Sequence, residues 1–554
     1  MSRRTVWTFL VASLLSLGTA GSTEAQQTTT LGTIDFPVSA TSAEAKEHFL
    51  KGAMMLHSFE WEDAAEAFQA AQQIEPDFAM AYWGEALSHT TGHHFPAGQN
   101  LAAAREVLSR LAETREERAA KAPTAREKAY LAAVEALYGP GDAQERALAY
   151  SEAMGQMHQN YPDDFEAATF YALSLMRSVR RGEGSIRQDM QAGAIAQTVL
   201  RQNENHPGAA HYTIHAYDDP IHSPIGLHAA LTYADIAPAA VHALHMPSHI
   251  FVQQGMWDYL ARSNKASWDA SVARVDARGE PPTRYSYHAL YWLQYAYLQQ
   301  GLRDKATETL ALIRPIAERE DGRRVRSTYA IMDARYTIAT RQWRRNPGLA
   351  ELVDRITVDP SEVRSHEAGA VLLAAGLSAA HLNDITEAQL ALRGLRELHD
   401  YLSNMGDDNQ SVTQVAVILN EVEGMVHFAQ GNHDSAIESL AKAASIEETM
   451  VAPSGPPGES PTDGPIKPSH ELYGELLLEL DRPGEATEQF AKALLRTPHR
   501  PLSLLGSARA AAGSGDAKTA RSRYAELETI WAGSAGQERA LNEAHRYLEQ
   551  AEEQ

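Results

Sequence analysis

The stretch AAEAFQAAQQIEP, Ala64 to Pro76, decides the fold. Its alanines and Phe68 recur at intervals of three and four residues, which places them on one face of a helix. The stretch ATEQFAKALLRTP, Ala486 to Pro498, carries matching small, aromatic, small and proline residues at the same offsets of 0, 4, 7 and 12. Ala520 lies 34 residues beyond the alanine that opens this second stretch. A unit of this length, repeated along the chain, predicts stacked pairs of helices.

These repeats resemble tetratricopeptide repeats (TPRs), in which small residues let two antiparallel helices pack closely. Each helix pair has an apolar face that it cannot bury alone, so neighbouring pairs must stack. We therefore predict an all-α, TPR-like solenoid of antiparallel helix pairs with a concave inner groove. Gly255, Gly301 and Gly431 each end a helical pattern, where a left-handed cap is expected.

One segment interrupts the helical pattern. Residues 451–468, VAPSGPPGESPTDGPIKP, are rich in proline, glycine and serine, which is typical of an irregular loop or linker. This segment divides the chain into a main repeat array, residues 41–450, and C-terminal TPR repeats, residues 469–548.

Composition narrows the classes of partner and of metal ligand. The chain has 554 residues, a formal net charge of −23 and no cysteine. Phosphate backbones repel such a negative surface, so we expect no nucleic-acid partner. Thiolate metal sites are excluded, and any metal ion must be held by nitrogen and oxygen ligands.

The N-terminus is typical of a secretory signal peptide. Arg3 and Arg4 precede an apolar run from Val6 to Leu17, and small residues stand three and one positions before Gln26. The run is too short to span a membrane, and no later stretch is long enough. We predict a cleavable signal over residues 1–25, no membrane span, and a periplasmic or secreted protein.

Histidines are concentrated in one part of the sequence. Of 23 in the chain, eight lie between His206 and His249. His211 and His215 are four residues apart and share a helix face. A second helix carries three histidines within an arc of about 60° at 100° per residue; these are His242, His245 and His249. Pro247 lies inside this second helix and should kink it.

The two histidine helices align one repeat apart, because each has a proline four residues before its first histidine. Adjacent packed helices are about 8–10 Å apart, so imidazoles from both can reach one metal ion. In TPR arrays the matching positions face the groove, as the resemblance implies. We predict a divalent transition metal (zinc, copper or iron) bound by the five histidines, with Asp218 as a further ligand or as an orienting residue.

Two other interpretations of the histidines stay open. They could form a hydrogen-bonded polar network or a pH-sensitive ligand groove. For the whole protein, the first hypothesis is a metalloenzyme or a metal-handling protein. The alternative is a non-catalytic TPR scaffold that binds a peptide or protein partner. Convergence of the histidines would favour the metal site, and outward splay would favour a partner surface.

The first helix of the next repeat is rich in aromatic residues; it is the stretch RYSYHALYWLQYAYLQQG, Arg284 to Gly301. In the TPR register, groove positions fall to His288, Tyr291 and Tyr295. Aromatic residues at helical spacing are more often core. Beside a metal site, however, they would make a plausible wall for a small molecule or peptide, so we predict that these three residues bind a groove ligand.

The segments HYTIHAYDDP (His211 to Pro220) and VHALHMPSHIFVQQGMWDYLARSN (Val241 to Asn264) resemble the core of a bacterial family of exported TPR proteins. That family carries a HAYD segment followed by HALHMPSHIF. The close match covers about 60 residues of this chain. The resemblance implies the helical-repeat fold and export, and it implies no activity.

Overall fold

The computed structural model describes residues 30–90, 100–179, 182–319, 322–405, 410–534 and 536–552. Within these ranges most helices pack on the next along the chain, and many alternate helices also touch. This contact pattern is that of stacked helix pairs, so the all-α helical-repeat prediction is confirmed. The predicted signal peptide lies outside the described residues. In the described part, no helix is both long enough and apolar enough to cross a membrane.

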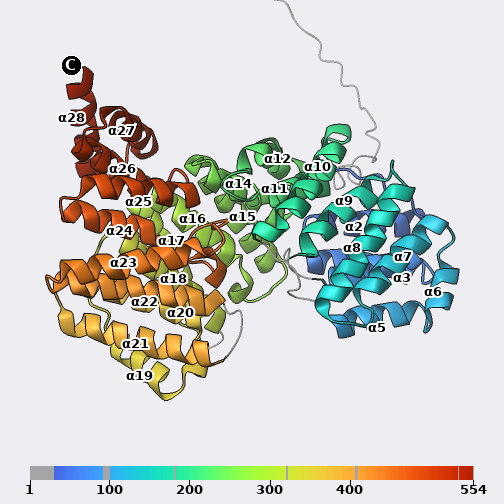
Figure 1. Cartoon of the computed structure of the whole chain (residues 1–554). Coiled ribbons are helices and arrows are strands. Elements are labelled where there is room, and N and C mark those ends of the chain that lie inside the picture. The colour runs from blue at the N-terminus through green and yellow to red at the C-terminus, as the bar shows by residue number, and fades with distance from the viewer. Residues whose placement is uncertain are drawn as a thin grey trace, which may run out of the picture.

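The first half of the chain forms one array of helices, shown from blue to green in Figure 1. Its elements are α2 (Ala43–His57), α3 (Trp61–Ile74), α4 (Ala79–Ser88), α5 (Leu101–Leu111), α6 (Arg115–Lys121), α7 (Ala125–Leu137), α8 (Ala143–Asn160), α9 (Phe165–Arg177), η1 (Glu183–Ser185), α10 (Ile186–Gln202), α11 (Pro207–Ala216) and α12 (Ser223–Ile236). Helix α2 also contacts α11, so this N-terminal array curls back on itself. Its interior is filled by aromatic rings that surround Phe36, and it forms a packed core.

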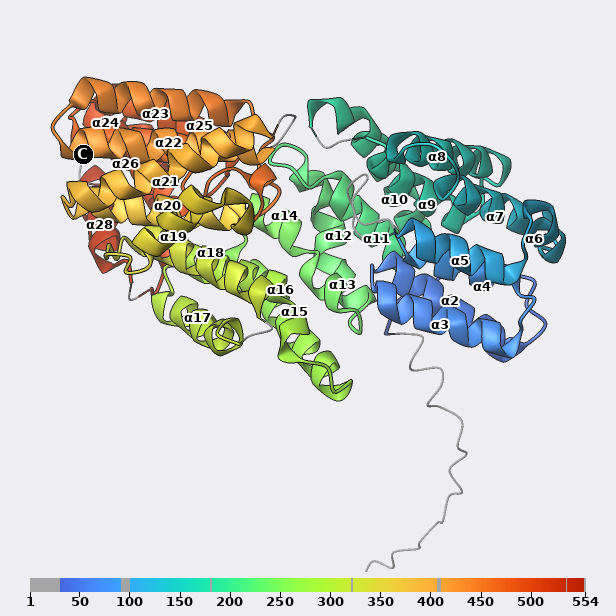
Figure 2. The ribbon, with the colours of Figure 1, turned by 90° about the horizontal axis from the view of Figure 1, so that it is seen from below.

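The second half forms a C-terminal array, shown from green to red. Its elements are α13 (Val241–His245), α14 (Ser248–Gln253), α15 (Trp257–Ala277), η2 (Pro282–Arg284), α16 (Tyr287–Gln299), α17 (Arg303–Ala317), α18 (Arg323–Thr340), α19 (Leu349–Val358), η3 (Pro360–Glu362), α20 (Ser365–His381), α21 (Ile385–Asn404), α22 (Gln410–Ala429), α23 (His433–Glu448), η4 (Pro461–Asp463), α24 (Ser469–Glu479), α25 (Pro483–Arg496), α26 (Pro501–Ser514), α27 (Ala517–Trp531) and α28 (Glu538–Glu552). This array curls as well, because the Trp531 indole donates to the Gln299 carbonyl at 2.9 Å. Helices α11 to α14 lie where the two arrays meet (Figure 2).

Local sequence accounts for the helix boundaries. Thr114, Thr124 and Asp142 each begin a helix with a reciprocal capping box. The three glycines predicted as left-handed caps, Gly255, Gly301 and Gly431, have φ of 63°, 70° and 78°. The repeat alanines and aromatics that define the pattern are buried, as stacking requires; these are Ala64, Phe68, Ala71, Ala486, Phe490, Ala493, Ala520 and Tyr524.

The segment 451–468, which we call the strap, has irregular backbone apart from η4. It does not part the array as a linker would, because α23 before it packs directly on α24 after it. Most of the strap is buried against helices of the C-terminal array. Side chains from those helices donate to its carbonyl oxygens: Gln253 to Pro453 at 2.9 Å, Arg335 to Pro457 at 2.6 Å and Gln414 to Gly464 at 2.7 Å. The proline- and glycine-rich composition therefore marks irregular backbone, but this segment is not exposed.

Candidate metal centre

Short helices between the two arrays present the histidines. Pro207 is the first residue of α11, where its missing N–H costs nothing. The predicted single helix from His242 to His249 is interrupted at Pro247, and α13 ends at His245 before α14 begins at Ser248. Because of this break, His249 lies on α14, whereas His242 and His245 lie on α13.

The histidines gather in two neighbouring clusters, each of which brings three ligand atoms within 4.8 Å of one another. The first histidine group is His211, His215 and His242. The second histidine group is His245, His249 and His288. The five predicted histidines thus divide between two groups: His242 and His245, one helical turn apart on α13, face different groups. His288, predicted to bind a groove ligand, completes the second group.

In the first histidine group, the Nε2 atoms of His211 and His242 are 3.2 Å apart. His211 is buried, and its Nδ1 donates to the His57 carbonyl oxygen at 2.6 Å. The backbone N–H of His242 donates to Glu60 Oε1 at 2.8 Å. Burial raises the pKa of Glu60 to about 7.

In the second histidine group, the Nε2 of His245 lies 3.2 Å from that of His249 and 3.0 Å from that of His288. The opposite ring nitrogens are all occupied. His245 Nδ1 contacts Asn264 Oδ1 at 2.7 Å, and His249 Nδ1 contacts Asp218 Oδ2 at 2.7 Å. His288 Nδ1 contacts a carboxylate oxygen of Glu459, which is part of the strap.

These contacts fix the tautomers of the second group. The Asn264 amide nitrogen donates to Ser248 Oγ and to the Leu260 carbonyl, so its oxygen faces His245 as an acceptor. Each Nδ1 therefore carries the proton that it donates to oxygen. When the rings are neutral, each Nε2 carries a lone pair. The lone pair of His245 then faces that of His249 at 3.2 Å and that of His288 at 3.0 Å. Such an arrangement is repulsive unless a proton or a metal ion lies between the rings, and it is the orientation that metal-bound histidines adopt.

Electrostatics keep the buried imidazoles in the form that binds metal. Burial lowers the pKa of His211 to about 3, and it lowers the pKa values of His242 and His245 well below 6.5. Neighbouring histidines lower the pKa values of His242 and His245 further. Burial also opposes the charge on His288, but the Glu459 carboxylate outweighs this effect and raises the pKa of that ring. His288 is the most exposed member, with 49% of its side chain accessible.

The remaining predicted residues have other positions. Asp218 belongs to neither group and instead accepts from His249 Nδ1. Tyr291 and Tyr295 are buried, with 2% and 3% of their surface exposed. Arg335 stacks 3.9 Å from the Tyr291 ring centre and bonds its hydroxyl, while Arg500 Nη1 lies 3.4 Å from the Tyr295 hydroxyl. Both tyrosines therefore lie in the core, because the strap and the returning C-terminal helices cover the face that was predicted to be an open groove.

Sequence reasoning missed the residues that support the histidines from elsewhere. Glu459 bonds His288 through one oxygen and accepts from the Trp292 indole through the other at 2.7 Å. Asn264 lies on α15, the helix that follows the histidine helices α13 and α14. Neither residue carries a local signal, because the pairing depends on how the strap and α15 pack.

A third cluster, His57, Glu166 and His206, is fully buried behind the first histidine group. Glu166 Oε2 is 2.6 Å from His57 Nε2, and Oε1 is 3.2 Å from His206 Nε2. Burial favours the neutral acid, but the two histidines outweigh it and lower the pKa of Glu166 to about 2. His206 Nδ1 accepts from the Ala209 N–H, which directs its other nitrogen to Glu166. This cluster holds the His57 backbone, whose carbonyl orients His211.

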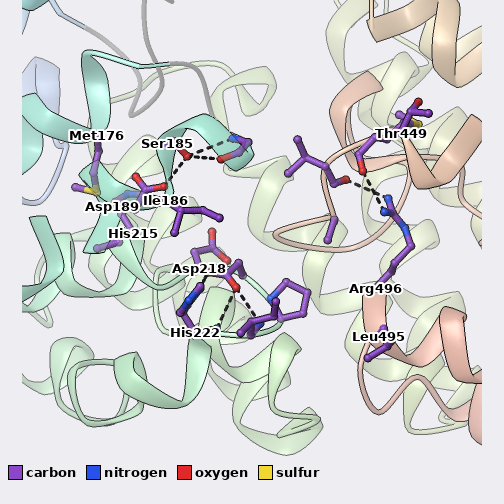
Figure 3. A pocket seen from close by; sticks show the side chains of 18 of the residues that line it. Met176, Ser185, Ile186, Asp189, His215, Asp218, His222, Thr449, Leu495 and Arg496 are labelled. Carbon is purple, nitrogen blue, oxygen red and sulfur yellow. Dashed lines mark hydrogen bonds and ion pairs between the residues drawn. The ribbon is translucent and has the colours of Figure 1, made fainter. Parts of the chain in front are cut away.

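A cavity of about 580 Å³ reaches the histidine groups from the space between the two arrays. Figure 3 shows His215, Asp218 and Asp189 on one wall, with Thr449 and Arg496 opposite. His215 belongs to the first histidine group, and Asp218 is bonded to the second. The cavity therefore borders one ligand of the first group and the carboxylate that contacts the second.

Comparison with known proteins adds little to this picture. No protein-family model matches the chain. No curated protein matches it either. Solved structures that resemble it include a human IFIT1 dimer with m7Gppp-AAAA, 11% identical, with a TM-score of 0.34, 90% of this chain and 92% of that chain covered. Yeast Tom70 is also 11% identical, with a TM-score of 0.27, covering 92% and 90%. The TPR domain of P58(IPK) is 11% identical, with a TM-score of 0.21, covering 92% and 100%. These values are low, and the assignment of a helical-repeat fold rests on the helix contacts.

Proposed function

We propose that this is an exported protein that binds transition metal ions, one at the first histidine group and one at the second. The observation that carries the proposal is the set of Nε2 atoms in the second group, which converge at 3.0 and 3.2 Å while every Nδ1 is engaged by an oxygen acceptor. Three imidazoles suit zinc, copper or iron, and the exposure of His288 gives solvent access to one ligand of the second group.

Two competing accounts make different predictions. A hydrogen-bonded network would place a shared proton between His245 and His288, and it would bind no metal. A TPR scaffold would need an open groove for a peptide. The strap occupies the inner surface of the C-terminal array, and aromatic side chains fill the interior of the N-terminal array, so these surfaces disfavour a peptide in either groove.

Elemental analysis of tag-free protein tests the proposal. We expect about two ions per chain after incubation with zinc, copper or iron and removal of free metal, one for each of the two histidine groups. His215→Ala and His288→Ala should each lose one ion, and the double variant should lose both. His228→Ala, which removes an exposed histidine of α12 outside both groups, is the control and should keep both. Absence of bound metal in the unmodified protein would overturn the proposal.

A further inference from the structure

Rings of the two histidine groups approach each other to within the longest ring spacing found inside one group. Between groups, the ring centres of His215 and His249 are 6.1 Å apart, and those of His242 and His245 are 6.2 Å apart. Within the first group, the ring centres of His215 and His242 are 6.5 Å apart. The six rings therefore form one continuous cluster.

Helix α13 sets the spacing of the two groups. His242 and His245 are three residues apart on one helix, so their side chains emerge about one turn apart, with Cβ atoms roughly 5–6 Å from each other. Each directs Nε2 to a different group. Ions bound at the two groups would therefore be neighbours, since rings that belong to different groups lie only 6.1 and 6.2 Å apart.

The charges around the cluster suit a pair of cations joined by a small anion. Three carboxylates contact the two groups: Glu60 accepts from the His242 N–H, Asp218 from His249 and Glu459 from His288. The three carboxyl groups carry at most three negative charges, so two divalent ions with six neutral imidazoles keep a net positive charge. A small anion would offset that charge, and it could enter from the cavity lined by His215 and Asp218.

We propose that the two histidine groups form one dinuclear centre, in which two ions share a small bridging oxygen ligand or an anionic analogue such as azide. The inference rests on the proposed metal binding, and it adds that the ions are coupled. The ligand that enters from the cavity would then be a small anion that contacts both metal ions at once.

Copper(II) is a suitable probe, because a bridge couples the two unpaired electrons and removes their signal from electron paramagnetic resonance. The full chain is loaded with copper(II), the bound metal is counted, and the spin signal is integrated against it. We expect two ions per chain, with less than half of the bound copper visible as isolated spins. Azide should change the absorption of the doubly loaded protein.

Variants separate this inference from the proposal on which it rests. His288→Ala changes a half-exposed ligand and should leave one copper ion with its full spin signal, whereas His228→Ala should behave as the unmodified protein. Two bound ions with full spin intensity, or a single ion per chain, would overturn the dinuclear centre and leave metal binding intact. No bound copper, zinc or iron would overturn the proposed function itself.

Discussion

The Nε2 atoms of His245 and His288 lie 3.0 Å apart, although the two residues come from different helices and each ring already donates through Nδ1. Two lone pairs at this distance repel each other, so the fold holds these side chains in a costly arrangement unless a proton or a metal ion lies between them. The supporting contacts are made by Asn264 and Glu459, and these contacts can be removed one at a time.

Glu459 should control the affinity of the second histidine group. Removing a residue that orients a metal ligand typically costs 10–100-fold in affinity. We expect Glu459→Ala to weaken binding at this group by about that factor, and Glu459→Gln to have a smaller effect, since its amide oxygen can still accept one of the two hydrogen bonds. Competition titrations in the His215→Ala background would report on this group alone. Equal affinities for all three forms would show that the strap does not support the site.

The packing of the strap should also be sensitive to replacement of its glycines by larger residues. A Cβ at Gly455 would lie 2.3 Å from Trp292 Cζ2, so Gly455→Ala must move the strap or the indole. Overpacking of this kind costs about 1–3 kcal/mol. Gly484 on α25 has no atom within 4 Å of the same added carbon, and Gly484→Ala should be neutral or stabilising by up to about 1 kcal/mol. Thermal unfolding of the two variants compares them, and similar effects would contradict the packing of the strap.

Glu471 anchors the junction that follows the strap. Its buried carboxylate lies 2.8 Å from both Lys467 Nζ and Arg500 Nε. Glu471→Gln would leave the buried Arg500 without its carboxylate partner, at a cost of about 3–5 kcal/mol, while Lys467 keeps Glu475 at 2.7 Å. The exposed pair of Arg396 and Glu423 is a control, since Glu423→Gln should cost at most about 1 kcal/mol.

The effect of Glu471 should depend on pH. Burial raises its pKa, but the charges of Arg500 and Lys467 outweigh burial and hold the pKa well below its ordinary value of 4.5. A carboxyl group with a depressed folded-state pKa stabilises the protein above its unfolded pKa, and that stability is lost as the pH falls towards the folded value. The gap in unfolding free energy between the unmodified protein and Glu471→Gln should therefore narrow below about pH 4.5. A gap that stays constant down to pH 3 would contradict the assigned ion pairs.

Local pattern was sufficient to predict the helical repeats. Ala64 and Phe68 are buried because close packing of two helices requires a small residue beside a large one, and this requirement recurs visibly along the sequence. The same periodicity placed His211 and His215 on one face of α11. Such information concerns neighbours within one helix.

The division of the site depended on tertiary packing. Pro247 splits the second histidine helix, so the angle between α13 and α14 decides which ring joins which group. Glu459 stands 171 residues after His288, and no local pattern connects them. The composition of the strap indicated irregular backbone correctly, but whether such a segment lies in solvent or inside the array depends on partners such as Gln253 and Arg335.

The most direct test of the central claim is anomalous diffraction at the zinc edge from crystals of the zinc-loaded protein. We expect two strong peaks, each about 2.0–2.1 Å from the Nε2 atoms of three histidines, one peak at each histidine group. Peaks confined to surface carboxylates, or imidazoles that stay in contact with one another with no peak between them, would contradict the claim.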